Sequence, residues 1–509
     1  MAGASEGNAE PHAPASDTPW SPPDAKSRKA SLWPFVASTA VLAVLVASGV
    51  GVYRLTRGAG HPSHWDEQVA PIASRVEALR GLTFKHPVKI SYLSVQSFEK
   101  KMTISPTDLR KERAQIQQST ALLRAAGLIG ADADLAGAVN TTQAADTVAF
   151  YDTTNKQIYV RGTGPLTIET RVTLAHELTH VLQDQHFNLP RLEKRADAST
   201  SGSSVALRAL IEGDAGRIEK RYLTEQSSAE QRVYAGLSAH DSAQATQRTQ
   251  AVPAVVDSFF GAPYVFGPEV VRVLEATDGN SAIDAALTGP TPTTRIFLDP
   301  TVINDAPLLP PIPALHTGEK AIKPSSGSDD QFDDFTLYLM LAARLDPPTA
   351  LRAADAYSSG SEVLYTSSGR TCFRASIAGR GAGADAYLGA TLRRWTETMP
   401  DARVDTTGAT TLLESCDPGS GANTPNDVNI HDAIALAAGR DTLTATLAAE
   451  HVEGAVAACA ARLLVQQGDF RDALIHPSAD VNATRREQLF RESAAAGAAC
   501  RADSQAGLP

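Results

Sequence analysis

An uncharged apolar segment, Leu32 to Tyr53, limits what this chain can be, because Val, Leu and Ala dominate it and no charged residue interrupts it. Its length is close to the roughly 20 residues that an α-helix needs to cross the hydrocarbon core of a bilayer. We therefore expect a transmembrane helix over residues 32–53. A cleaved signal peptide is the alternative interpretation, but the apolar core of a signal peptide is shorter, about 7 to 15 residues.

The flanking charges predict the orientation of this helix. Three basic residues lie shortly before the segment and two lie just after it, so the positive-inside rule slightly favours a cytoplasmic N-terminus. Residues 1–31 are rich in Pro, Ala, Ser and Asp, which predicts a disordered cytoplasmic tail. The rest of the chain is then expected on the outer side of the cell membrane, as part of a single-pass protein.

The cysteines provide an independent test of this topology, because all four follow the apolar segment: Cys372, Cys416, Cys459 and Cys500. An even number of cysteines suits disulfides in an oxidising compartment. The simplest of the possible connectivities pairs neighbours along the chain, Cys372 with Cys416 and Cys459 with Cys500. Buried free thiols are the alternative.

Length and charge narrow the class of protein. The chain has 509 residues, enough for several domains, with 46 basic and 57 acidic residues and a net charge of −11. No basic stripe of the kind that binds nucleic acid is present, so we exclude a nucleic-acid partner. Composition and linkers predict three units: a catalytic core at 65–235, a mostly helical subdomain at 236–417 and a helical module at 426–509.

An α+β core is predicted between residues 86 and 225. A strand is expected in His86–Leu93, and two β-favouring runs, Thr147–Asp152 and Gln157–Arg161, flank a polar turn and predict a hairpin. Apolar residues then recur at helical spacing from about Leu166 to His186, and a second helix is expected from about Ser203 to Glu225.

The first of these helices contains the motif His176-Glu177-Leu178-Thr179-His180. Residues four apart on an α-helix lie on nearly the same face, so His176 and His180 can reach one metal ion. Glu177 points to the neighbouring flank, where its carboxylate can act as general base on a water molecule. Two imidazoles and a carboxylate suit Zn²⁺, which leaves a position for water, so the pattern predicts zinc-dependent peptide hydrolysis.

Two residues compete for the role of third ligand. His186 lies six residues after His180, as in the metzincin pattern, but that pattern needs a glycine where this chain has Gln183, so His186 is expected to point away at the helix end. Glu212 is the better candidate, because it lies in an apolar helical stretch where an unpaired carboxylate would be costly. A salt bridge to Arg208, one turn earlier, is the alternative for this carboxylate.

The residues after Glu212 suggest how the second helix packs. Gly213 would allow another backbone to approach closely, and Asp214 could support the site although it should face away from Glu212 on a regular helix.

These motifs resemble the gluzincins, metallopeptidases in which a downstream glutamate on a second helix completes a His-Glu-x-x-His site. Four segments carry the resemblance: Phe150–Asp152, Ile158–Val160, Ala175–Phe187 and Ala209–Ala215. The chain is similar to poorly characterised bacterial membrane-associated members in which a Pro-Tyr pair, here Pro263-Tyr264, also occurs. The resemblance implies a zincin-like core, a small sheet with an edge strand and an active-site helix, and a protein or peptide substrate. It departs from the usual pattern in having Asp214 two residues after the glutamate.

A peptidase of this kind also needs a donor that stabilises the oxyanion of the transition state. Tyr264 is our first candidate, and Tyr357 and Tyr365 are the next. Two other functions stay open at this point: a catalytically inactive module that keeps the fold for binding at the cell surface, and a metal-dependent amidase that acts on cell-wall material. An intact Glu177 favours the peptidase over the inactive module, because a protein freed from catalysis has no need of it.

Overall fold

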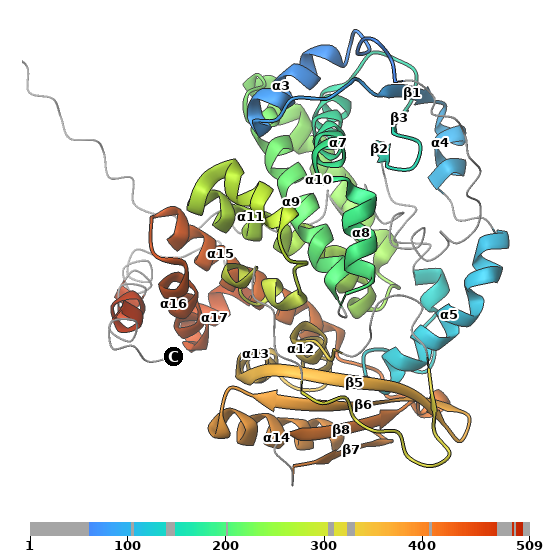
Figure 1. Ribbon diagram of the computed structural model, residues 1–509, viewed down its shortest axis with the longest axis vertical. Helices are drawn as coiled ribbons and strands as arrows, with labels where there is room; N and C mark the ends of the chain where they lie inside the picture. Colours follow the sequence, from blue (N-terminus) through green and yellow to red (C-terminus); the bar gives the residue numbers. More distant parts are fainter. Residues whose placement is uncertain are drawn as a thin grey trace, which may run out of the picture.

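The computed structural model describes residues 61–102, 106–138, 148–199, 202–303, 310–322, 331–406, 410–475, 491–492 and 495–501 (Figure 1). The expected cytoplasmic tail and transmembrane helix, residues 1–53, lie outside this part of the chain. In the ranges given above, no helix is both long and apolar enough to cross a membrane. The fold is α+β, as expected, and contains one three-stranded and one five-stranded sheet.

The three-stranded sheet lies at the upper end of Figure 1 and has the order β1-β3-β2. Its strands are β1 (Lys89–Leu93), β2 (Ala149–Asp152) and β3 (Gln157–Arg161). β2 and β3 form the predicted antiparallel hairpin, with Asp152 opposite Gln157, and β1 pairs with β3 in parallel. Within the described chain β2 is therefore an edge strand.

Two long helices next to this sheet confirm the predicted pair. They are α7 (Ile168–Phe187) and α9 (Ser203–Thr224). The Thr167 side chain accepts a hydrogen bond from the Thr170 N–H and caps the start of α7, while Asn188, in the left-handed conformation, ends it. Apolar side chains of α7 and α9 share one cluster with β2, β3 and the preceding helix α3 (Ala70–Arg80). This cluster fixes the two helices against each other and the sheet.

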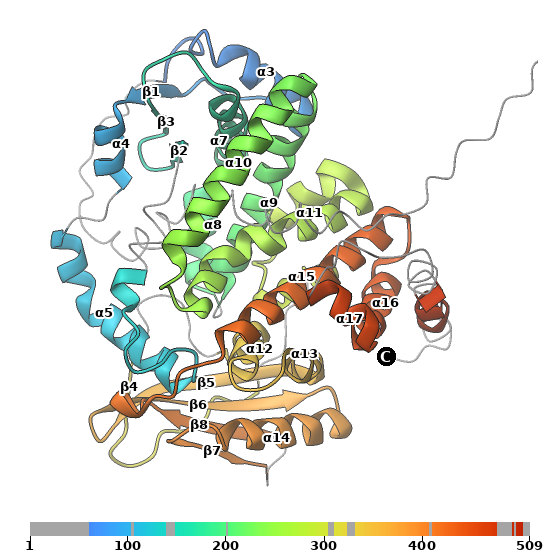
Figure 2. The ribbon, with the colours of Figure 1, turned by 180° about the vertical axis from the view of Figure 1, so that it is seen from behind.

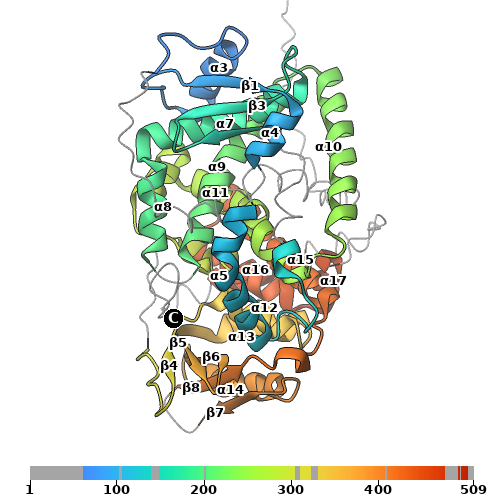
Figure 3. The same ribbon diagram turned by 90° about the vertical axis from the view of Figure 1, so that its right-hand side faces the viewer.

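The segment after α9 forms a single helix, α10 (Ser228–Thr249). A capping box stabilises its start, because the Ser227 and Glu230 side chains each accept a hydrogen bond from the other residue's backbone N–H. α10 runs along the side of the molecule in Figure 3, and of its residues only Ser242 and Ala245 are buried.

The rest of the helical layer packs against α9. Its central element is α11 (Ala254–Thr288), which is interrupted by non-helical backbone at Asp278 and Gly279. One apolar cluster takes in residues of α9, α11, α12 (Asp334–Ala342), α13 (Pro347–Ala356) and α15 (Asp427–Ala449). This core crosses both expected boundaries, near 235 and near 417–426.

The remaining helices are α4 (Val95–Met102), α5 (Pro106–Ala125), α8 (Leu189–Asp197), α14 (Ala382–Thr396), α16 (Gly454–Gln466), α17 (Gly468–Ile475) and the 3₁₀ helices Thr294–Phe297, Pro300–Val302 and Gly419–Gly421.

The expectation of a mostly helical subdomain at 236–417 is wrong for its second half, which forms an antiparallel sheet of order β4-β5-β6-β8-β7. Its strands are β4 (Lys320–Ala321), β5 (Tyr357–Ser367), β6 (Arg370–Gly379), β7 (Ala402–Asp405) and β8 (Thr411–Cys416), with α14 packed on β6–β8 (Figure 2). Ser368 and Gly369 both have positive φ and close a tight hairpin between the two long strands, which overrides the helical propensity nearby.

Both disulfides have the neighbour pairing expected from the sequence. Cys372–Cys416 joins directly opposite residues of β6 and β8, and Cys459–Cys500 ties α16 to the C-terminal described segment. No cysteine remains free.

Candidate metal centre

Two imidazoles on α7 and one carboxylate on α9 converge at the interface of these helices. His176 Nε2 lies 3.0 Å from His180 Nε2 and 3.2 Å from Glu212 Oε2, and His180 Nε2 lies 3.5 Å from the same oxygen. All three side chains are buried, with exposed fractions of 4%, 5% and 5%. The structure therefore brings the three predicted ligands together, and they form the one group of three such residues that could hold a metal ion in the described part of the chain.

The spacing of these atoms fits a tetrahedral ion. Ligand atoms at about 2.0–2.1 Å from a tetrahedral Zn²⁺ are roughly 3.3 Å apart, which agrees with the separations between the three side chains. The donor set, two neutral nitrogens and one carboxylate oxygen, also leaves a fourth position for water or substrate.

The charges of the three groups depend on one another. Burial opposes ionisation of Glu212, but the adjacent His180 and His176 outweigh it and hold the pKa of this carboxyl well below its ordinary value. Burial likewise opposes charging of His176, but Glu212 and Glu219 raise its pKa well above the usual range. Positive charge next to Glu212 thus favours its ionised form, and a bound cation would supply that charge in place of the imidazole protons.

Glu177 is more deeply buried than the three converging ligands, with 1% exposed. Its Oε2 accepts a 2.8 Å hydrogen bond from the Tyr151 N–H on β2, while Oε1 is buried and has no hydrogen-bond partner among the described residues. Burial raises the pKa of Glu177 to about 7, and the charges of His176 and His180 limit that rise. One oxygen is therefore anchored to the sheet and the other is free to exchange a proton.

A second carboxylate on α9, Glu219, orients the first histidine. Its Oε2 lies 3.0 Å from His176 Nδ1, and its Oε1 accepts a 2.9 Å hydrogen bond from the Tyr234 hydroxyl on α10. Neither residue was predicted from the sequence, although Glu219 follows Glu212 by seven positions, two helical turns, and so shares its face. Contacts of this kind fix the ring orientation of a metal-binding histidine.

Gln183 orients the second histidine. Its Oε1 lies 2.9 Å from His180 Nδ1, and its Nε2 donates to the Ile211 carbonyl and to Asp214 Oδ2, both at 3.0 Å. Asp214 is completely buried and also accepts a 2.7 Å hydrogen bond from Arg80. Asp214 thus supports the site, as expected, but it does so through Gln183, the residue that stands where the metzincin pattern has a glycine.

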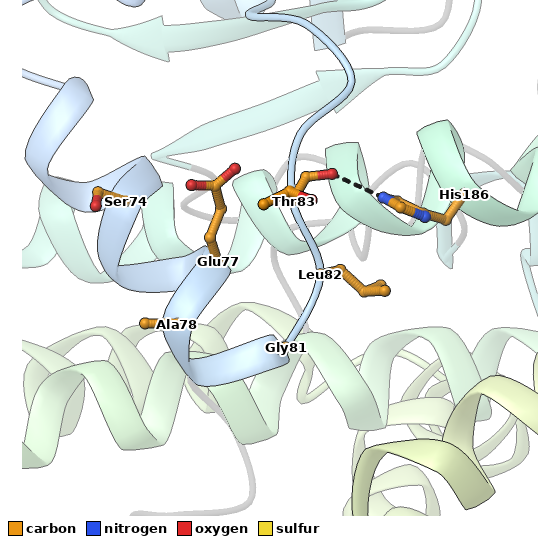
Figure 4. Close-up of a pocket in the computed structure, with 7 residues that line it drawn as sticks. All are labelled: Ser74, Glu77, Ala78, Gly81, Leu82, Thr83 and His186. Carbon is orange, nitrogen blue, oxygen red and sulfur yellow. Dashed lines mark hydrogen bonds between the residues drawn. The ribbon is translucent and has the colours of Figure 1, made fainter.

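His186 lies outside this centre, as predicted. Figure 4 shows it at the far end of α7, where its Nε2 lies 2.8 Å from the Thr83 carbonyl oxygen. It borders a surface pocket of about 410 Å³ whose other lining residues are Ser74, Glu77, Ala78, Gly81, Leu82 and Thr83. The pocket contains none of the three converging ligands.

Of the three candidate tyrosines, one lies near the converging ligands and two lie elsewhere. The Tyr264 hydroxyl on α11 is buried without a partner in the described ranges, and burial together with the charges of Glu212 and Glu177 raises its pKa well above the ordinary value. It therefore lies beside the metal centre. The Tyr357 hydroxyl instead donates to the Phe332 carbonyl, and Tyr365 packs against Arg374 in the five-stranded sheet, so neither second-choice tyrosine lies at this site.

Comparison with protein-family models, with curated proteins and with solved structures finds no match for this chain.

Proposed function

We propose that the chain is a zinc-dependent metallopeptidase of the gluzincin type, in which His176, His180 and Glu212 hold the ion. The observation that carries the proposal is the convergence of these three ligand atoms next to a glutamate whose second carboxylate oxygen has no partner in the described chain. Two imidazoles and one carboxylate are a ligand set typical of catalytic zinc.

The side chains around the centre supply the proton transfers. A zinc ion in this site would lower the pKa of a water molecule and polarise the substrate carbonyl. Glu177, held by the Tyr151 N–H, would accept the proton of the attacking water at Oε1 and deliver it to the leaving amine nitrogen. The Tyr264 hydroxyl, which needs an acceptor, would donate to the oxyanion.

The position of β2 supports an extended peptide as substrate. β2 pairs with β3 on one side, and on the other the Tyr151 N–H points to Glu177 of the active-site helix. The open edge of the sheet thus faces the metal centre. An extended peptide could add to this edge by backbone hydrogen bonds, which would bring its carbonyl groups past the ion.

We further propose that the peptidase works outside the cytoplasm and is anchored to the cell membrane by residues 32–53. The two disulfides support an oxidising compartment, because such bonds are rare where thiols are kept reduced. The apolar segment supports the anchor by its length and lack of charge.

The decisive experiment compares the full-length chain with Glu177→Gln and with Glu397→Gln, an exposed glutamate at the C-terminal end of α14 that serves as control. Each protein is analysed for zinc and incubated with a randomised peptide library, and products are identified by mass spectrometry. We expect about one zinc per chain in all three, and cleavage by the parent and the control only.

Three other outcomes would change the conclusion. Equal cleavage by Glu177→Gln would remove Glu177 from the mechanism, and absence of zinc would remove the metal. Zinc binding without cleavage of either peptides or cell-wall amides by the parent would favour the inactive binding module.

A further inference from the structure

A partly exposed arginine, Arg208, lies one helical turn before the metal ligand Glu212 on α9. Residues four apart on a helix share a face, so Arg208 projects on the same side of α9 as the ligand carboxylate. The residues around it, 206–207 and 209–215, are all buried, whereas Arg208 keeps contact with solvent. Of residues 206–215 it is therefore the one that reaches solvent, and it does so one turn from Glu212.

Arg208 differs from the other arginines of α9 in forming no ion pair with any residue that the structure describes. Arg217 and Arg221 both pair with Glu275 on α11. Arg208 makes no ion pair or hydrogen bond with any residue in the described ranges, and Glu212 contacts the two histidines instead of it. The predicted alternative, an Arg208–Glu212 salt bridge, is thus not formed, and the guanidinium is available to a ligand.

Groups on two neighbouring helices indicate where the guanidinium lies. Its positive charge counteracts the rise in the pKa of the Tyr264 hydroxyl on α11 and of Glu193 on α8, and Glu193 is also influenced by His180. Arg208 is therefore close to both α8 and α11, on the side of the centre where Tyr264 has a buried hydroxyl without a partner in the described chain. Arg208 and the Tyr264 hydroxyl are thus both donors near Glu212, the first on α9 and the second on α11.

We propose that Arg208 binds a carboxylate of the peptide substrate and so gives the enzyme a preference for acidic substrates. A guanidinium presents paired N–H donors that match the two oxygens of a carboxylate, and such charged hydrogen bonds are stronger than neutral ones. The carboxylate has two possible sources, the free C-terminus of a short peptide or an acidic side chain near the scissile bond. This inference rests on the proposed peptidase function.

The test uses four kinds of randomised hexapeptide library. The first has a free C-terminal carboxylate and the second a C-terminal amide. The third and fourth are also C-terminal amides, with Glu or Gln, respectively, fixed at each position in turn. For the parent we expect kcat/KM to be at least about tenfold higher in one of two comparisons: for the free-acid library over the amide library, or for the Glu libraries over the Gln libraries. The first result identifies a chain terminus as the ligand and the second an acidic side chain. Arg208→Met should bring the favoured ratio close to one, Arg208→Lys should keep part of it, and Arg221→Met is the matched control that should keep it fully.

A second readout separates this inference from the peptidase proposal. The same libraries are bound to zinc-loaded Glu177→Gln protein, with and without Arg208→Met, and the retained peptides are quantified. If the parent cleaves nothing but the carboxylate libraries bind selectively through Arg208, the peptidase proposal fails and the carboxylate site stands. If the parent shows no carboxylate preference in either assay, or if Arg208→Met loses zinc and weakens all libraries equally, the carboxylate site is wrong.

Discussion

Glu219 contacts His176 on the side of the ring opposite to Glu212, with its Oε2 3.0 Å from Nδ1 while Nε2 faces the ligand carboxylate. The imidazole is thus held between two carboxylates of the same helix, and the Nδ1 contact favours the tautomer whose Nε2 lone pair can bind a metal. Tyr234 in turn holds Glu219 from α10, so a largely exposed helix takes part in orienting a buried ligand.

Loss of this contact should weaken metal binding without removing a ligand. We expect Glu219→Ala to lower zinc affinity tenfold to about a hundredfold, because contacts that orient a ligand typically contribute that much. Tyr234→Phe should have a smaller effect in the same direction, and Glu225→Gln, at the end of α9, should have none. Competition with a chromophoric chelator measures all three, and unchanged affinity in Glu219→Ala would contradict the role given to this contact.

The identity of the third ligand can be tested with a pair of alanine variants. Glu212→Ala should lose bound zinc, because it removes the only carboxylate oxygen that converges with the two Nε2 atoms in the described chain. His186→Ala should retain it, since His186 lies at the far end of α7 beside Thr83. Metal content after dialysis is the measurement, and the reverse result would favour a metzincin-like site.

The crossing of α9 and α11 should tolerate no side chain at Gly213. A Cβ atom there would lie 2.3 Å from the Gly267 carbonyl oxygen, a distance at which backbone must move. We expect Gly213→Ala to lower the free energy of unfolding by about 1–3 kcal/mol, in the range typical of overpacking.

Gly216, on the same helix, is the matched control for this variant. A Cβ atom at Gly216 meets nothing within 4 Å, so Gly216→Ala should raise the free energy of unfolding by roughly 0.5–1 kcal/mol through helix propensity. Denaturant unfolding compares the two, and equal stability of both variants would show that the helices separate easily at this crossing.

A half-buried acid on α11, Asp257, should make stability depend on pH. Burial raises the pKa of Asp257 to about 7, and its Oδ1 has no hydrogen-bond partner among the residues described. The folded state therefore keeps the proton up to a higher pH than the unfolded chain, whose aspartates titrate near about 3.9. The stability that this group contributes is complete below about pH 4 and is lost as pH rises through about 7.

Asp257→Asn should remove this dependence, because the amide does not ionise. At pH 8 we expect the variant to exceed the parent in free energy of unfolding by about 1–3 kcal/mol, and to lose most of that advantage at pH 4. Urea unfolding at the two pH values is the measurement. An advantage of the same size at both pH values would mean that ionisation of Asp257 is not the cause.

The three converging candidate ligands could be predicted because each depends on local helix geometry. His176 and His180 share a face by their spacing alone, and Glu212 stood out as a carboxylate in an apolar helical stretch. The contacts that orient the histidines depend on how α7, α9 and α10 pack together. For that reason Tyr234 and Gln183 carried no signal in the sequence, and Glu219 carried only its spacing from Glu212.

The second sheet escaped prediction for a related reason. Its long hairpin contains β-branched and aromatic residues, but alanine-rich helices, α13 and α14, flank it directly and the strands lack strict alternation of burial. The Ser368-Gly369 turn was the local signal available. The long-range pairing of β6 with β8, which the Cys372–Cys416 bond links, could not be read from either strand alone.

The division of the centre between two helices has a consequence for how the protein matures. α7 alone provides the two imidazoles. α9 provides the third candidate ligand, Glu212, and also Glu219, which contacts His176, and Asp214, which accepts a hydrogen bond from Gln183. Only the docked pair offers the complete set of oriented donors, so an ion held at this centre would bind the assembled helices much more tightly than either helix by itself. Metal binding and helix docking would then be thermodynamically linked, and scarcity of the metal would leave a population of chains in which this interface is loosened.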